Sequence, residues 1–255
     1  MYFDTHAHYD DEKFDFDRDE AIKRAYSEGV LNIVNIGANI ESSKKSIDLA
    51  NKYDFVYAAV GVHPEEIATL PDDYIDILEK LVNNNREKVV AIGEIGLDYY
   101  CSDVPRDVQQ KFFVEQIHLA KRVDLPVVIH SRDAHKDTLD IIKRENVNKG
   151  ILHCFSGSQE MADEVLKNGL YIAIGGVVTF KNAKKVVEVI KNIPMDRLLV
   201  ETDLPYLAPE PFRGKRNESG YLKYIVEKIA NIKNMSSDDV ARITTENARE
   251  LYGIK

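Results

Sequence analysis

Cysteine and long apolar runs are both scarce in this chain. Its two cysteines, Cys101 and Cys154, do not form a metal-binding pair by spacing, and they suit a reducing compartment better than a disulfide scaffold. No apolar run approaches the ~20 residues that a membrane helix needs. The first residues also lack the basic and apolar regions of a signal peptide. We therefore expect a cytoplasmic protein with no membrane partner.

Net positive charge is missing as well. The 255 residues include 34 Lys and Arg against 43 Asp and Glu, which gives a formal net charge of −9. Proteins that bind along duplex nucleic acid normally cluster Lys and Arg on one face, so the composition argues against a broad basic footprint. A small site in which bound cations supply the positive charge remains compatible with this composition.

Short apolar runs alternate with amphipathic stretches along the whole chain. The runs recur roughly every 20 to 36 residues, which is typical of repeated βα units whose strands are buried on both faces. The predicted strands are Tyr2–His6, Leu31–Gly37, Val56–Val62, Val89–Ile95, Pro126–His130, Gly150–His153, Leu170–Gly175 and Leu198–Thr202.

Eight such units predict a (β/α)8 TIM barrel, an α/β fold that commonly takes about 250 residues. No linker or internal repeat interrupts the pattern, so residues 1–255 are expected to form a single domain. The last predicted helix, near Ser237–Tyr252, is expected to pack on the outside of the barrel. A doubly wound sheet has the same periodicity and stays open as the alternative fold.

Histidine and carboxylate side chains stand where these predicted strands end. In a (β/α)8 barrel the carboxyl ends of all strands open onto one face, so residues that are distant in sequence meet there. His6 and His8 are two positions apart on a strand and therefore point to the same side. Glu94 follows a buried apolar run, where an unpaired carboxylate is costly. The predicted metal ligands are His6, His8, Glu94, His130, His153 and Asp203.

Each of these signals has an ordinary structural explanation when taken alone. A strand-end histidine can be a turn residue, Glu94 can belong to a structural ion pair, and Asp203 can cap a helix. Their coincidence at equivalent strand ends favours metal ligation, and imidazole mixed with carboxylate suits Zn²⁺, Mn²⁺, Fe²⁺ or Co²⁺ better than an all-oxygen Mg²⁺ cage. We predict two divalent ions (Mg²⁺, Mn²⁺ or Zn²⁺) that activate a water, with Glu94 and Asp203 as catalytic residues.

A basic loop follows the last predicted strand. It contains Arg213, Lys215 and Arg216, which can bind phosphate groups above the metal face. Arg132 and Lys181 follow other strand ends and can serve the same purpose. A merely solvated surface is the competing explanation for such a charge run.

Two further residues are expected near the metals or the substrate. His63 follows the third predicted strand, and Glu201 precedes Asp203 by two positions on the same face, where it can orient a ligand. Several aromatic residues near the strand ends can stack on nucleic-acid bases, although ordinary packing explains each equally well. These are Tyr99, Tyr100, Phe155 and Phe180.

Taken in order, these motifs resemble the signature blocks of the TatD family from one end of the chain to the other. The resemblance implies a TIM barrel of the metal-dependent hydrolase type and a divalent-metal-dependent deoxyribonuclease, commonly a 3′→5′ exonuclease. It implies metal binding by the same six residues and roles near the site for His63 and Glu201. The family's usual proline after Asn217-Glu218 is absent here. The blocks are Asp4–His8, Gly93–Tyr99, Ile129–Arg132, His153–Gly157, Glu201–Pro209 and Arg213–Asn217.

Three functional hypotheses follow from the sequence. The first is a two-metal phosphodiesterase that acts on DNA ends. The acidic net charge of the chain favours a short single-stranded end as its substrate over a long duplex. The second is a hydrolase of a small ester, lactone or amide, such as an aminoacyl ester, which needs the same metals but not the basic loop. The third, a catalytically silent metal-binding module, is disfavoured because structural metal sites usually close their shell with protein groups. We expect a monomer.

Overall fold

The computed structural model describes residues 1–255 and contains eight parallel strands that pair in chain order. Their burial is almost continuous, because helices cover one side and the barrel interior fills the other. Each strand lies within a few residues of its predicted position. The strands are β1 (Tyr2–Ala7), β2 (Val30–Ile36), β3 (Val56–Val60), β4 (Val89–Asp98), β5 (Val127–Arg132), β6 (Gly150–Leu152), β7 (Tyr171–Ile174) and β8 (Leu198–Val200).

The sheet closes between its first and last strands. The Asp203 N–H donates to His6 O at 2.9 Å, and the His8 N–H donates to Leu204 O at 3.0 Å. Ala7 and Leu204 form a parallel bridge at the same place. The chain-order pairing and this closure confirm the TIM barrel and exclude the doubly wound sheet.

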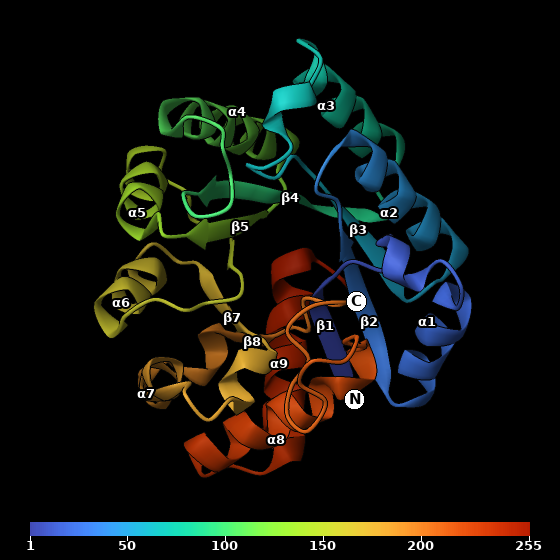
Figure 1. Ribbon diagram of the computed structural model, residues 1–255, viewed down its shortest axis with the longest axis vertical. Helices are drawn as coiled ribbons and strands as arrows, with labels where there is room; N and C mark the ends of the chain where they lie inside the picture. Colours follow the sequence, from blue (N-terminus) through green and yellow to red (C-terminus); the bar gives the residue numbers. More distant parts are fainter.

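The chain has nine α-helices, of which α1–α8 lie around the strands (Figure 1). Asn39 caps the start of α2, since its side chain accepts the Ser42 N–H at 2.9 Å while Ser42 Oγ accepts the Asn39 N–H at 2.8 Å. The helices are α1 (Arg18–Ser27), α2 (Ile40–Lys52), α3 (Tyr74–Asn84), α4 (Arg106–Val123), α5 (His135–Arg144), α6 (Gln159–Lys167), α7 (Lys184–Asn192), α8 (Leu222–Lys233) and α9 (Ser237–Tyr252). None of them combines the length and apolar character that crossing a bilayer requires.

The position of α9 differs from the prediction. We expected it on the outside of the barrel, but its last turns share a hydrophobic cluster with alternate side chains of all eight strands. Tyr252 stacks on Phe3 with ring centroids 5.8 Å apart, and its hydroxyl donates to Thr5 O at 3.1 Å. The reason is that α9 has an apolar face that continues past Leu251 to Ile254 and fills the amino-terminal end of the barrel. The opposite, carboxyl-terminal mouth is where the site lies.

Candidate functional site

The six predicted ligands converge at the carboxyl-terminal mouth of the barrel. They come from β1, β4 and β5 and from the residues that directly follow β1, β6 and β8. His6 and Glu94 are buried, and His8 and Asp203 are partly exposed to the cavity above them. The strand alternation that predicted a shared direction for His6 and His8 is observed, because their Nε2 atoms lie 3.0 Å apart.

Four of the six side chains form a first group of ligand atoms. His6 Nε2 lies 3.3 Å from Glu94 Oε2 and 3.7 Å from Asp203 Oδ1. His8 Nε2 lies 3.7 Å from the same Glu94 oxygen and 3.6 Å from the same Asp203 oxygen. A tetrahedral ion with bonds of about 2.0–2.1 Å separates its ligand atoms by about 3.3–3.4 Å. The distances in the first group are close to this spacing, and His6, His8 and Asp203 form a set of side chains that could hold a metal ion.

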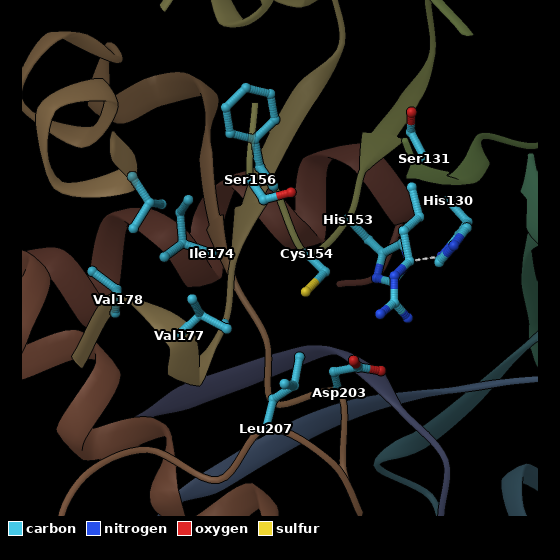
Figure 2. Close-up of a pocket in the computed structure, with 14 residues that line it drawn as sticks. His130, Ser131, His153, Cys154, Ser156, Ile174, Val177, Val178, Asp203 and Leu207 are labelled. Carbon is cyan, nitrogen blue, oxygen red and sulfur yellow. Dashed lines mark hydrogen bonds between the residues drawn. The ribbon is translucent and has the colours of Figure 1, made fainter. Parts of the chain in front are cut away.

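The other oxygen of Glu94 belongs to a second group. Glu94 Oε1 lies 2.9 Å from His130 Nδ1 and 2.7 Å from His153 Nε2. The two imidazole nitrogens are 3.2 Å apart, the contact drawn as a dashed line in Figure 2. His63 Nε2 also lies 3.7 Å from this oxygen, which places His63 beside the second group. Glu94 thus directs one carboxylate oxygen into each group.

Neighbouring groups fix two of the imidazole rings. His8 Nδ1 donates to Ile36 O at 2.9 Å, which leaves Nε2 with its lone pair toward the first group. His130 Nε2 bonds to Asp98 Oδ2 at 3.1 Å and so directs Nδ1 toward Glu94. Histidines that bind metals are commonly oriented in this way by a carbonyl or a carboxylate.

Ionisable side chains are concentrated in the site, and several of them are buried. Burial alone would raise the pKa of Glu94, but His153, His6 and His63 together hold it well below its ordinary value. Burial would likewise lower the pKa of His153, and the nearby Glu94 carboxylate raises it well above the ordinary value. Protons and cations therefore compete for the same imidazoles, because a metal ligand must be a neutral imidazole.

Asp98 is a residue of the site to which the sequence analysis assigned no role. It is buried, contacts His130 and accepts the N–H groups of Tyr100 and Cys101 at 2.8 and 2.7 Å. These donors and His130 keep the pKa of Asp98 below its ordinary value despite its burial. The signal that identifies it is strand alternation, since Asp98 lies four positions after Glu94 on the same side of β4.

Asp4 is a second residue whose role was missed. Its buried carboxylate accepts the Thr202 N–H at 2.9 Å, the Thr202 hydroxyl at 2.6 Å and the Ser219 hydroxyl at 2.6 Å. These bonds tie β1, which carries His6, to the segment that carries Asp203. A carboxylate in the middle of a buried strand was the available signal, because such a group requires partners.

Glu201 lies behind His153 rather than among the ligand atoms. Its Oε1 accepts the Cys154 N–H at 2.6 Å and lies 3.7 Å from His153 Nδ1, too far for a hydrogen bond. His153 Nδ1 and Glu201 Oε2 are buried and have no hydrogen-bond partner. The position agrees with the expected place of Glu201 next to the ligands.

The predicted phosphate-binding residues lie in different surroundings. Arg132 is exposed at the cavity wall, with its guanidinium carbon 4.5 Å from the Tyr100 ring centroid, and it forms no ion pair. Arg213 and Lys215 are exposed in the loop after β8 and also lack carboxylate partners. Lys181 is exposed but does not line the cavity.

Arg216 corrects the prediction for this loop. Its guanidinium bonds to Asp17 at 2.5 and 2.7 Å and to Glu218 at 2.8 Å, and it lies over the Phe14 ring. These contacts attach the loop to the start of α1. A guanidinium that is already paired with two carboxylates is not available for a substrate phosphate. Arg216 is therefore a structural residue.

Replacing Arg216 with alanine should destabilise the protein more at neutral than at acid pH. The bond to Arg216 lowers the pKa of Asp17 from 3.8 to about 2. A carboxyl group with a lowered pKa stabilises the fold above its unfolded pKa, and this contribution is lost as the pH falls toward the folded pKa.

Urea unfolding of R216A and the wild type at about pH 6 and about pH 3 checks this expectation. The difference in the free energy of unfolding between the wild type and R216A should be smaller at the lower pH. The neighbouring K215A variant, which removes no carboxylate bond, should show no such narrowing. A difference for R216A that is equal at both pH values would contradict the assignment.

The mouth contains two adjoining cavities. The larger and more open one, of about 630 Å³, lies above the ligands, and its wall near β1–β3 is acidic. The smaller one, of about 250 Å³, opens beside His153 and Asp203 and is shown in Figure 2. The acidic wall consists of Asp10, Asp11, Glu65 and Glu66.

Comparisons with known proteins agree with this geometry. A family model described as "TatD related DNase" matches residues 3–253. An uncharacterized metal-dependent hydrolase of Bacillus subtilis, YabD, is 48% identical over 256 residues, which is 100% of each chain. The uncharacterized metal-dependent hydrolase YcfH of Escherichia coli is 36% identical over 98% of this chain and 95% of its own.

Solved structures give the same result. The crystal structure of YJJV, a TatD homolog from E. coli, superposes with a TM-score of 0.95 at 32% identity and covers 100% of this chain and 98% of that one. A TatD-family hydrolase of Entamoeba histolytica follows at 25% identity and a TM-score of 0.89, over 100% of this chain and 99% of its own. The protein therefore belongs to the TatD family of metal-dependent hydrolases.

Proposed function

We propose that this protein is a two-metal phosphodiesterase that removes nucleotides from the 3′ ends of single-stranded DNA. The observation that carries the proposal is the position of Glu94, whose two oxygens lie in two separate groups of ligand atoms. A carboxylate placed in this way suits a pair of cations at the short separation that phosphodiester hydrolysis uses.

The donor set names the residues that would hold each ion. His6, His8 and Asp203 would share one cation with Glu94 Oε2, and His130 and His153 would share the other with Glu94 Oε1. Four imidazoles among the donors favour Zn²⁺ or Mn²⁺, although Mg²⁺ remains a candidate. When bound, such ions lower the pKa of water and neutralise the charge that develops on a phosphoryl oxygen.

Asp203 is the proposed proton acceptor. Its Oδ1 faces the His6 and His8 nitrogens, whereas its Oδ2 has no hydrogen-bond partner and the residue lines both cavities. Burial would raise the pKa of Asp203, but the nearby imidazoles of His8, His6 and His153 keep it below its ordinary value. An ionised carboxylate at this position can take the proton of the attacking water.

The distribution of charge around the mouth supports a DNA end as the substrate. Arg132 lines both cavities without a carboxylate partner and can bind a phosphate that flanks the scissile bond. Arg213 and Lys215 do not line the cavities, but they are unpaired cations in the loop after β8 and can bind phosphates farther along the strand. The acidic wall repels a second phosphate backbone, which favours a single strand over a duplex. The family description as a DNase points to the same class of substrate.

The acidic wall also favours a second candidate function. Four carboxylates beside the ligands could bind the ammonium group of an aminoacyl ester, a substrate that has no use for Arg213 or Lys215. The same cations would activate water for attack on the ester carbonyl. The two functions differ in which side of the mouth recognises the substrate.

An activity panel with the purified protein separates the two functions. Single-stranded DNA, duplex DNA, RNA, aminoacyl-RNA and simple esters would each be tested with Mg²⁺, Mn²⁺ and Zn²⁺, and with a chelator as the control. We expect release of mononucleotides from the 3′ end of single-stranded DNA, lost with the chelator and weakened by added salt. Faster turnover of the aminoacyl ester than of any DNA would contradict the proposal.

A further inference from the structure

The smaller cavity beside the ligands is lined mainly by apolar side chains. They come from the segment after β6, from β7 and the 3-10 helix Gly176–Thr179, from α7 and from the loop after β8. Figure 2 shows Ile174, Val177, Val178 and Leu207 around the space, with Cys154 and Asp203 at its inner side. The apolar lining consists of Cys154, Phe155, Ile174, Val177, Val178, Val186 and Leu207.

Two glycines allow this cavity to form. A Cβ at Gly176 would collide with Leu207 O, so glycine is needed for the 3-10 helix to approach the loop that carries Leu207. A Cβ at Gly157 would come within 2.8 Å of the Phe155 ring, which forms part of the wall. The walls of the cavity therefore depend on a close backbone approach at Gly176 and on close side-chain packing against Gly157.

The cavity is continuous with the catalytic centre. His130, Arg132, His153, Asp203 and Leu207 line both the smaller and the larger cavity. A bound molecule can therefore place one group in the smaller cavity while its scissile bond lies over the ligands. Arg132 stands at this junction without a carboxylate partner and can bind a phosphate that bridges the two spaces.

Size and lining decide what the smaller cavity can hold. Its volume of about 250 Å³ is below the roughly 300–1,000 Å³ of pockets for drug-sized ligands, so it suits a single ring system. Aliphatic side chains such as Ile174 and Val178 can contact a flat ring, and the Ser156 hydroxyl can pair with its polar edge. A phosphate inside would be costly, because the apolar wall offers it no compensation.

We propose that this cavity binds the terminal nucleobase of a single-stranded DNA end, an inference that rests on the proposed nuclease function. The base enters the cavity, the adjoining phosphate lies at Arg132 and the ligands, and the remaining strand leaves through the larger cavity on the side away from its acidic wall. Only one nucleotide then fits beyond the scissile bond. The cavity thereby makes the enzyme require a strand end and release one nucleotide at a time.

The test compares two oligodeoxynucleotides in the metal-loaded enzyme. One has an ordinary 3′-terminal nucleotide, and the other has an abasic 3′-terminal residue with the same sugar and phosphate. The wild type should cleave the ordinary end with a kcat/KM about tenfold higher or more, since base contacts of this kind contribute strongly to single-strand binding. Equal cleavage of the two ends by the wild type would overturn the inference without any variant.

Val177→Phe supplies the matching change in the protein. Val177 is half-buried at the cavity, so a larger side chain fills the space without entering the barrel core. This variant should lose most of the preference for the ordinary end. Val187→Phe on α7, also half-buried but outside the cavity, should keep the preference. A folded V177F enzyme that retains the full preference would overturn the inference.

The results also separate this inference from the function on which it rests. Chelator-sensitive cleavage of DNA with no preference between the two ends would leave the nuclease proposal in place and refute the base-binding cavity. Absence of cleavage on both oligonucleotides, with any of the three metals, would refute the nuclease proposal and the cavity assignment together.

Discussion

Replacing Asp203 with asparagine should lower kcat by about 10³-fold or more, because the substitution removes the charge of a proposed metal ligand together with the proposed proton acceptor. Asparagine has nearly the same shape as aspartate, so the barrel should stay folded. Turnover of single-stranded DNA at saturating Mn²⁺, measured beside the thermal unfolding curve, checks both statements.

The matched control is Asp76→Asn, which makes the same change at an exposed position of α3. Asp76 is not one of the candidate ligands, and its side chain makes no hydrogen bond. It should retain the wild-type kcat. A folded D203N enzyme with kcat within about threefold of the wild type would contradict the role of Asp203 in general base catalysis, which typically contributes about 10²–10⁴-fold.

Glu94→Gln should have the second large effect, on metal binding as well as on activity. Glu94 presents one oxygen to the His6–His8–Asp203 group and the other to the His130–His153 group. Glutamine keeps one weak acceptor and loses the negative charge that the two proposed cations would share. We expect the bound metal to fall from about two ions per chain to one or none, and kcat to fall with it.

Metal analysis of the purified variant after dialysis gives the first result, and thermal unfolding gives an independent one. Added Zn²⁺ or Mn²⁺ should raise the unfolding temperature of the wild type, since a ligand that binds only the folded state stabilises it. The same ions should raise the unfolding temperature of E94Q much less. Glu188→Gln, an exposed change on α7, should behave as the wild type. Full metal content in E94Q would exclude Glu94 as the bridging ligand.

The fold was largely predictable because parallel barrel strands leave a plain record in the sequence. A strand such as β4 is buried along its whole length, and its sequence is therefore a nearly continuous apolar run. The position of α9 was not predictable in the same way. Its pattern shows an apolar face, but periodicity does not tell whether that face covers the outer wall or fills the end of the barrel, as it does here.

The candidate ligands were predictable for a related reason. Barrel geometry brings every strand end to one mouth, so residue type and position along a strand were enough to group His6, His130 and Asp203 before any distance was known. Asp98 was missed because its role is to orient His130, and that role depends on a contact between two strands. Strand alternation from Glu94 would have been the way to find it.

Arg216 and the smaller cavity mark the limit of sequence reasoning in this protein. A basic loop near a predicted phosphate site looks the same whether or not a distant carboxylate pairs with it, and the partner of Arg216 is Asp17 in another part of the chain. The cavity arises from segments that follow three different strands and from the close approach at Gly176. Neither feature is a property of one local stretch of sequence.

Anomalous X-ray scattering from crystals grown with Mn²⁺ tests the central claim most directly. The account predicts two peaks at the barrel mouth, one beside His6, His8 and Asp203 and the other beside His130 and His153, with Glu94 between them. Absence of both peaks, or manganese bound only elsewhere on the protein, would contradict it.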